Sequence, residues 1–259
     1  MELKKPMQLF GISTKLIRFG DDLVDAILEA LSRQGLEIED KDLLAITSKA
    51  VAVAQKRLVK LSSIEPSEKA KMFAEKYELE PTFAEVVLRE AEKVYGGVTK
   101  TLLTLKNNVL VANAGVDRKN APEGYVILWP LNPHESAEKI RREILARTGK
   151  HVGVLIIDSR ITPLRMGTTA LAIGVAGFKP IKDCRVERDL FSKRICITRH
   201  ALADDLASAA HLVMGETTAR TPAVLMRNAP VALSEEFNPN SMTIPAEQCL
   251  FTQSFYACV

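Results

Sequence analysis

The sequence predicts an α+β protein, in which mixed or antiparallel sheets are flanked by helices. Segments with helical spacing of apolar residues and segments with strand patterns follow one another without strict alternation along the 259 residues. Two apolar runs, Thr101–Leu105 and Val109–Ala112, flank the polar connection Lys106-Asn107-Asn108, which is typical of a β-hairpin. Both observations argue against a doubly wound parallel sheet, in which strands and helices alternate.

Periodicity and capping residues predict the elements of the N-terminal half. Proline is favoured in the first turn of a helix, because the N–H that it lacks has no partner there. Gly96-Gly97 is expected to break the chain after the last of these helices. We expect a strand over Asp42–Ile46 that ends at Thr47-Ser48-Lys49, and helices over Asp21–Arg33 (capped by Gly20 or Asp21), from Pro66, and from Pro81 to about Tyr95.

The C-terminal half is predicted in the same way. A wholly apolar run such as Val152–Ile157 is typical of a strand buried on both faces. The tail from Glu235 to Val259 is expected to be irregular and then unusually apolar. We also expect a helix over Ser136–Thr148 ended by Gly149, a helix over Arg199–Met214 capped by Thr198 and ended by Gly215, and a short strand over Ala223–Met226.

Composition narrows the class of protein. A net charge of +3 spread over the chain forms no basic stripe, so nucleic-acid binding has no electrostatic support. The N-terminus has no secretory h-region, and no segment approaches the roughly 18 apolar residues that span a bilayer, so we expect a cytoplasmic protein without a membrane partner. The four cysteines match no zinc spacing and are expected to be reduced thiols, while His211 is expected to be a surface or packing residue.

The length permits one catalytic unit over residues 1–259. No repeat or linker divides it, and Gly96-Gly97 is the one internal break. The chain is therefore expected to split, at most, into two interleaved subdomains of about 1–95 plus 185–259 and of 96–184.

Three carboxylates each follow an apolar element and lie beside glycine or other small residues: Asp117, Asp158 and Glu216. Ser159 adds a hydroxyl group next to the second. Oxygen ligands of this kind suit Mg²⁺ or Mn²⁺ better than Zn²⁺, so these residues predict a divalent metal site if they meet. The alternative for Asp158, taken alone, is that it starts a turn or caps a following helix.

Five stretches carry a resemblance to a known family: ITSKAVAVAQKR, ANAGVDRKNAPEG, PLNPHESAEKIRREI, VGVLIIDSRITPLRMGTTALAIGVAGFKPIKD and ADDLASAAHLVMGE. In order and in spacing they are similar to those of the coenzyme F-420:L-glutamate ligases (gamma-glutamyl ligases). The resemblance extends from about Gly11 to Arg227. Neither a P-loop nor a G-x-G-x-x-G motif occurs, so a nucleotide would be held by a less common scaffold.

The resemblance implies a GTP-dependent amide ligase that uses two divalent ions, Mg²⁺ or Mn²⁺, and works as a homodimer. GTP phosphorylates the carboxylate of the acceptor, and the amine of L-glutamate then displaces phosphate. Asp158 and Arg165 are the expected catalytic residues; Arg165 would hold an acidic substrate or the acyl phosphate, or else forms a surface ion pair. By resemblance, the metal ligands are Asp117, Asp158, Ser159 and Glu216, and the contacts to GTP are Ser48, Lys49, Asn120 and the Gly215 turn.

Some positions depart from the family pattern. The metal positions are kept while positions nearer the substrates differ, which leaves open the same chemistry on a folate-type pteridine. A metal-dependent nucleotide phosphohydrolase and a nucleotide-binding regulator are further alternatives. The departures are Val53 for a second lysine, Gln55-Lys56 for Glu-Gly, Asn132 for Asp, Ile161-Thr162-Pro163 for Gly-Arg-Pro, and missing glycines near Val186 and Ser192.

The end of the chain, CLFTQSFYACV, is too apolar for an ordinary frayed terminus. An apolar segment of this kind favours aggregation when it is exposed, so we expect it to be buried. Two sites of burial are open, the core of its own chain and the interface of a homodimer.

Overall fold

The computed structural model describes residues 5–236 and 238–256. The chain forms two compact units. Each unit is built from three segments that are far apart in the sequence, so the chain passes from one unit to the other several times. The bounds differ from the subdomains expected from the sequence, 1–95 plus 185–259 and 96–184. The first unit holds residues 1–55, 130–159 and 168–242, and the second unit holds residues 56–129, 160–167 and 243–259.

A five-stranded sheet forms the centre of the first unit. Its strands, in spatial order, are β1 (Gln8–Ile12), β12 (Ala223–Arg227), β2 (Leu43–Thr47), β8 (Gly153–Ile161) and β9 (Thr168–Ala176). β12 is antiparallel to β1 and to β2, whereas β2 and β8 are parallel. This mixed sheet confirms the predicted α+β class.

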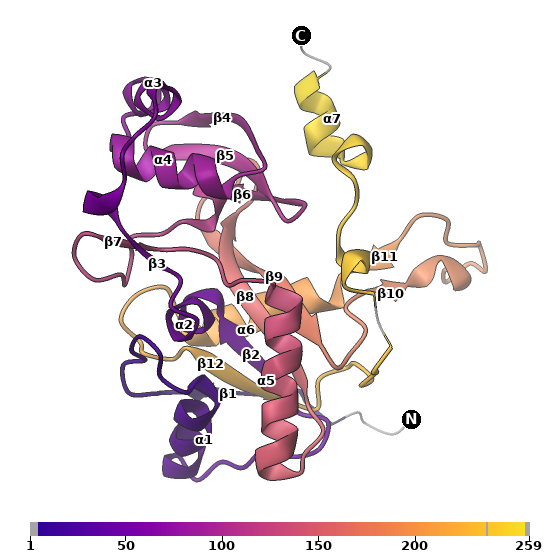
Figure 1. Cartoon of the computed structure of the whole chain (residues 1–259). Coiled ribbons are helices and arrows are strands. Elements are labelled where there is room, and N and C mark those ends of the chain that lie inside the picture. Colours follow the sequence, from indigo (N-terminus) through magenta and orange to yellow (C-terminus); the bar gives the residue numbers. More distant parts are fainter. Residues whose placement is uncertain (1–4, 237, 257–259) are drawn as a thin grey trace. The chain divides into compact units, whose positions relative to one another are not determined.

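Four helices accompany this sheet: α1 (Leu23–Arg33), α2 (Ser48–Ala54), α5 (Pro133–Thr148) and α6 (Leu202–Met214). α5 and α6 both pack against β9 (Figure 1). α6 contributes Leu206, Ala207 and Ala210 to the main core, where they join Leu43 and Leu155 of the sheet. Small alanine side chains let the helix backbone approach the sheet closely, which explains the alanine-rich sequence of α6.

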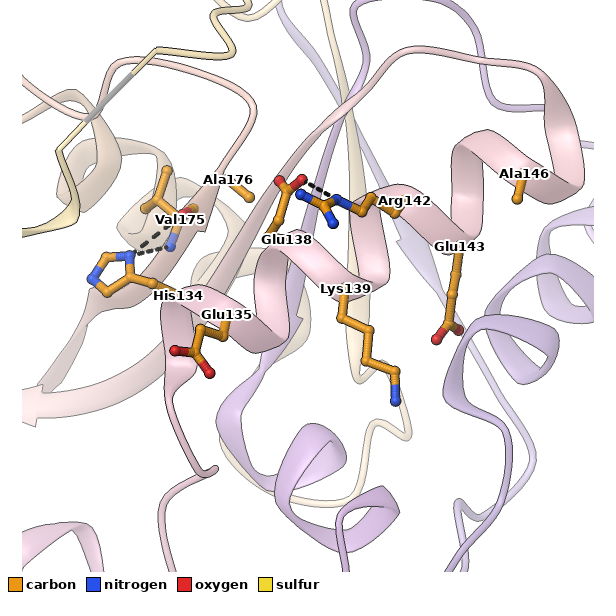
Figure 2. A pocket seen from close by; sticks show the side chains of 9 residues that line it. All are labelled: His134, Glu135, Glu138, Lys139, Arg142, Glu143, Ala146, Val175 and Ala176. Carbon is orange, nitrogen blue, oxygen red and sulfur yellow. Dashed lines mark hydrogen bonds and ion pairs between the residues drawn. The ribbon is translucent and has the colours of Figure 1, made fainter.

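Side chains of both helices cover the outer strand β9. The backbone N–H of Ala172 donates to Asp204 Oδ1 at 3.0 Å, and the N–H of Val175 donates to His134 Nδ1 at 3.1 Å (Figure 2). Burial lowers the pKa of His134, against a smaller opposing effect of the Val175 carbonyl group. His134 Nδ1 can accept from the strand because the imidazole is neutral. The side chains of His134 and Asp204 thus occupy backbone N–H groups of β9, which protects this edge of the sheet from pairing with another strand.

A short hairpin in the first unit joins β10 (Lys182–Asp183) to β11 (Arg199–His200) and carries the short 3-10 helix η3 (Cys184–Val186). It extends away from the sheet (Figure 1). Leu190, near its tip, is fully exposed, and Phe191 is 81% exposed. The predicted helix over Arg199–Met214 is therefore too long, because its first residues pair with β10 and α6 begins only at Leu202.

The second unit combines small sheets with two helices packed on them. Its core holds Phe83, Val87, Leu102, Val126 and Leu128. The three-stranded sheet is β4 (Lys93–Val98), β5 (Thr101–Lys106) and β6 (Val109–Ala112). The two-stranded sheet is β3 (Leu58–Lys60) with β7 (Tyr125–Ile127). The helices are α3 (Glu68–Tyr77) and α4 (Pro81–Glu90), with α7 (Leu250–Tyr256) near the end of the chain. Short 3-10 helices elsewhere are η1 (Leu61–Ser63), η2 (Asn113–Gly115), η4 (Pro239–Met242) and η5 (Ala246–Gln248).

Several predicted boundaries in this unit are confirmed and others are wrong. Asn107 and Asn108 both have positive φ, as a tight hairpin turn requires, and Pro81 begins α4. Pro66 lies before the helix instead, because Ser67 caps α3 and accepts from Ala70 N. α4 ends at Glu90, and Gly96-Gly97 lies inside β4 beside a bulge, where pairing with β5 keeps the chain extended.

The apolar tail is not buried within the described chain. Leu250 is 77% exposed on α7, and Phe251 is exposed as well, whereas Thr252 is buried and donates to the Cys249 carbonyl at 3.2 Å. Phe255 to Val259 lie outside the residues whose side chains are described. Burial in the core of its own chain is therefore wrong for the part that is seen. Among the described residues, no helix has the length and apolar character needed to cross a membrane.

Candidate functional site

The parallel strands β2 and β8 bring Ser48 and Asp158 together. Their ladder ends where Thr47 pairs with Ile157, so the next residue of each strand lies at the same edge of the sheet. Ser48 Oγ donates a hydrogen bond of 2.8 Å to Asp158 Oδ1. Ser48 is buried and Asp158 is half-buried, which holds both side chains in place. Two residues that the family resemblance assigned to one site thus touch each other.

β8 continues past Asp158 to Ile161. The alternative that Asp158 starts a turn or caps a helix is therefore wrong, and so is its expected position at the very tip of the strand. Successive side chains of a strand point to opposite faces. The carboxylate of Asp158 and the hydroxyl of the adjacent Ser159 therefore point away from each other, and side chains of both cannot bind the same ion in this geometry.

Lys49 lies in the first turn of α2. Thr47 caps this helix by accepting from Ala50 N at 3.3 Å, which turns the chain sharply after β2. Lys49 is half-buried and follows directly on the Ser48 that contacts Asp158. Lys49 is therefore attached to the same edge of the sheet as Asp158.

Glu216 lies just beyond the end of α6, as expected. Its Oε1 accepts from Thr168 Oγ1 at 2.8 Å and contacts His211 Nε2 at 2.7 Å. Gly215, between helix and carboxylate, has φ 69° and ψ 176°, a backbone region that is open almost only to glycine. The predicted Gly215 helix end is confirmed. The sequence did not predict the partners of Glu216, because Thr168 begins a different element and the expectation for His211 is a surface or packing role.

Asp117 lies in the second unit, after a left-handed loop. Asn113, Ala114 and Gly115 all have positive φ, and Asp117 then pairs with Ile127 through two backbone hydrogen bonds. A Cβ on Gly115 would lie 2.2 Å from Nε1 of the buried Trp129, so no other residue fits there. The Asp117 carboxylate accepts from Lys119 N at 2.8 Å.

Two predicted residues of the second unit are exposed. Asn120 lies in the loop after Asp117 and has a φ of 65°. Arg165 ends a turn, which its N–H closes by donating to the Thr162 carbonyl. Exposure fits side chains that contact a ligand, but it fits surface side chains equally well. The predicted site residues thus divide between the units, with Asp117, Asn120 and Arg165 in the second and Ser48, Lys49, Asp158, Ser159, Gly215 and Glu216 in the first.

The donor set fits a hard divalent ion by chemistry. Asp117, Asp158 and Glu216 offer carboxylate oxygens and Ser159 a hydroxyl, the ligands that Mg²⁺ and Mn²⁺ prefer. Among the described residues, however, no three histidine, cysteine, aspartate or glutamate side chains are grouped closely enough to hold an ion. The residue types therefore fit a hard divalent ion.

Gln55, one of the departures from the family pattern, closes a ring of hydrogen bonds in the first unit. Its Nε2 donates to Ser136 Oγ at 2.7 Å, and its Oε1 accepts from Leu131 N at 2.9 Å. Ser136 Oγ in turn donates to the Leu131 carbonyl at 2.7 Å. A glutamate at this position would offer acceptors only. Gln55 therefore stabilises the loop before α5 through these hydrogen bonds.

Lys56 stands where the family pattern has glycine, and Ser192 lies near a position where a glycine is expected. Their φ angles are 62° and 63°, in the left-handed region that favours glycine. Val186 differs, because it ends the short helix η3, a conformation open to any residue. The backbone is therefore strained at Lys56, where the family pattern has glycine, and at Ser192, near another such position.

A groove of about 610 Å³ runs along α5 (Figure 2). It is open and lined by side chains of both charges, among them Glu135, Lys139 and Arg142, together with His134 and Val175. None of the predicted site residues is among the described residues that line it. This groove therefore lies apart from the predicted site residues.

Comparison with known proteins gives consistent results. A family model described as F420-0:gamma-glutamyl ligase matches residues 11–228. A coenzyme F420:L-glutamate ligase of Methanopyrus kandleri is 42% identical over 212 residues, 82% of each chain. Proteins of the same name from Archaeoglobus fulgidus and Methanothermobacter thermautotrophicus are 38% and 36% identical, over 84% and 86% of this chain and 85% and 90% of their own.

Proposed function

Since this chain belongs to the F420-0:gamma-glutamyl ligase family and is therefore a ligase, we propose that it joins L-glutamate to the carboxylate of a coenzyme F420 precursor, F420-0, with GTP as the energy source. The names of the relatives support the glutamate and the F420-type acceptor. The observation that carries the proposal in the structure is the contact between Ser48 and Asp158, which builds a polar corner at the end of two parallel strands.

The reaction proceeds in two steps. An ionised carboxylate does not react with an amine at neutral pH, because its oxygen is a poor leaving group. In the first step, a carboxylate oxygen of the acceptor attacks the γ-phosphorus of GTP, the bond to the β-phosphate oxygen breaks, and GDP leaves. In the second step, the amine of L-glutamate attacks the carbonyl carbon of the acyl phosphate and loses a proton. The C–O bond then breaks, which yields the amide and inorganic phosphate.

The chain's own residues position the reactants and balance their charge. Phosphoryl transfer depends mainly on positioning and charge neutralisation. Lys49, beside the Ser48–Asp158 contact, faces the phosphates of GTP, and Arg165 holds the acidic substrate or the acyl phosphate. Asn120 and the Gly215 turn complete the nucleotide contacts.

Two Mg²⁺ or Mn²⁺ ions would be held by Asp117, Asp158, Ser159 and Glu216. When bound, such ions neutralise phosphate charge and orient the transferred group. Because Asp158 and Ser159 point to opposite faces of β8, we assign their side chains to different ions.

We also propose that the working form is a homodimer. Leu190 and Phe191 on the hairpin and Leu250 on α7 are exposed apolar side chains on separate units. Leu190 and Phe191 are neighbours in the sequence, and a partner chain that covered them would remove their apolar surface from water. A second copy of the chain is the partner that the family resemblance suggests.

The experiment is a mass-spectrometric assay with F420-0, L-glutamate, GTP and Mn²⁺. We expect a product one glutamate residue heavier, and GDP release that depends on both glutamate and acceptor. Parallel reactions with ATP and with folate-type pteridines measure the preference for nucleotide and acceptor. GDP release without glutamate would indicate a phosphohydrolase, and nucleotide binding without turnover would indicate a regulator; either result contradicts the proposal.

A further inference from the structure

We propose that His211 is a positioning residue that, together with Thr168, holds the carboxylate of Glu216 in the orientation needed to bind a divalent cation. This inference rests on the proposed function, which makes Glu216 a metal ligand. It assigns a role to two residues to which the family resemblance assigned none.

Two side chains from different elements meet at one oxygen of Glu216. His211 Nε2 lies 2.7 Å from Oε1, and Thr168 Oγ1 donates to the same oxygen at 2.8 Å. An ionised carboxylate only accepts hydrogen bonds, so the hydrogen of the first contact must be on His211 Nε2. Two donors at fixed positions restrict both the place of this oxygen and the rotation of the carboxylate plane.

The surrounding backbone makes the arrangement rigid. His211 lies in the last turn of α6, and Thr168 is the first residue of β9. Gly215 ends the helix, with its N–H donating to the His211 carbonyl at 3.0 Å, and turns Glu216 back towards the helix. A Cβ at Gly215 would meet only Ala219, at 3.7 Å, so the turn needs glycine for its backbone angles and not for space.

Partial burial distinguishes this pair from an ordinary surface ion pair. The side chains of His211 and Glu216 are 18% and 32% exposed. His200 and Asp205, a similar pair near the start of the same helix, are 51% and 66% exposed. A contact that is shielded from water holds its geometry better than an exposed one. The His200–Asp205 pair therefore serves as a matched control.

The role follows from the chemistry of metal ligands. A carboxylate that binds a metal ion is usually oriented by hydrogen bonds from neighbouring groups, and loss of such a group weakens metal affinity or activity by about 10- to 100-fold. The imidazole of His211 supplies one of these hydrogen bonds and Thr168 the other. Removing either side chain should therefore weaken metal binding, although Glu216, the ligand, is still present.

The test measures Mn²⁺ binding to the full-length protein by electron paramagnetic resonance, without acceptor or glutamate. The variants are His211→Leu, which removes the donor, His211→Gln, which keeps an N–H donor, Thr168→Val and the control His200→Leu. Glu216→Gln reports the loss of the ligand itself. Thermal unfolding of each metal-free variant separates loss of binding from loss of fold.

We expect His211→Leu and Thr168→Val to bind Mn²⁺ about 10- to 100-fold more weakly, and His211→Gln and His200→Leu to bind as the unaltered chain does. If His211→Leu does not fold, Thr168→Val carries the test. Unchanged affinity in folded His211→Leu or Thr168→Val, with weak binding in Glu216→Gln, would overturn the positioning role and leave the proposed function standing. Unchanged affinity in Glu216→Gln would overturn the assignment of Glu216 as a ligand, and the positioning role with it.

Discussion

Ser48 and Asp158 are 110 residues apart in the sequence, and Ser48 Oγ donates a hydrogen bond of 2.8 Å to Asp158 Oδ1. The contact exists because Thr47 and Ile157 are the last paired residues of two parallel strands. The carboxyl ends of parallel strands are a common place for ligands. The contact therefore fixes a polar corner, and Lys49 is the residue that follows Ser48 in α2.

Lys49 is expected to contribute to nucleotide binding. Val53 stands where the family pattern has a second lysine, so Lys49 should supply more of the positive charge at the phosphates. Lys49→Ala should weaken GTP binding by one or two orders of magnitude, about 1.4 to 3 kcal/mol. Titration calorimetry measures this loss. Lys139→Ala, at an exposed position of α5, is the control and should bind GTP normally; equal affinity of the two variants would exclude this role for Lys49.

His134 is expected to make stability depend on pH. Burial lowers the pKa of its imidazole in the folded state, so below the ordinary pKa of 6.5 the unfolded chain binds more protons than the folded one. Stability contributed by neutral His134 is therefore complete above that pH and is lost as the pH falls. The melting temperature should drop between about pH 7.5 and about pH 5.5.

His134→Asn should reduce this dependence, because an amide oxygen can accept from Val175 N without titrating near neutral pH. His151→Asn, at an exposed position, should leave the pH dependence as it is. A His134→Asn protein that loses as much stability on acidification as the unaltered chain would contradict the assignment.

Lys56 is expected to lower the stability of the native chain. Its φ of 62° is costly for any residue with a Cβ. Lys56→Gly should therefore raise the free energy of unfolding by about 1 kcal/mol, as measured by denaturant titration. Lys56→Ala keeps the Cβ and should bring no such gain. Lower stability of the glycine variant than of the alanine variant would show that the strain is absent.

The tail is expected to take part in assembly. Leu250 and Phe251 are exposed on α7, so a dimer interface is the site of burial that is left for them. Deletion of residues 246–259 should produce monomers or insoluble protein in light scattering. Ser254→Ala, on the same helix, should remain dimeric. Dimers that survive the deletion with unchanged stability would show that the tail has no part in assembly.

Features that depend on neighbouring residues could be predicted from the sequence. The run Val152–Ile157 predicted a buried strand, the two asparagines after Lys106 predicted a hairpin turn, and Gly149 and Gly215 predicted helix ends. In each case the sequence carries the signal locally, as side-chain periodicity or as a residue suited to positive φ.

Features that depend on distant partners could not be predicted in this way. Gly96-Gly97 reads as a chain break, yet pairing with β5 makes it part of a strand. Arg199 and His200 fit a helix by composition, but they pair with β10. The contact between Thr168 and Glu216 joins residues 48 positions apart, and the hydrogen-bond ring of Gln55 needs residues more than 70 positions away. Tertiary contacts override local preference at each of these places.

The most direct test of the account is product formation by Asp158→Asn in the presence of F420-0, L-glutamate, GTP and Mn²⁺. The substitution removes one negative charge and keeps the size of the side chain, and Ser48 can still donate to the remaining carbonyl oxygen. We predict a folded protein with an unchanged melting temperature and no glutamylated product by mass spectrometry. Product formation near the rate of the unaltered chain would contradict the assignment of Asp158 to the reaction and, with it, the site proposed at the ends of β2 and β8.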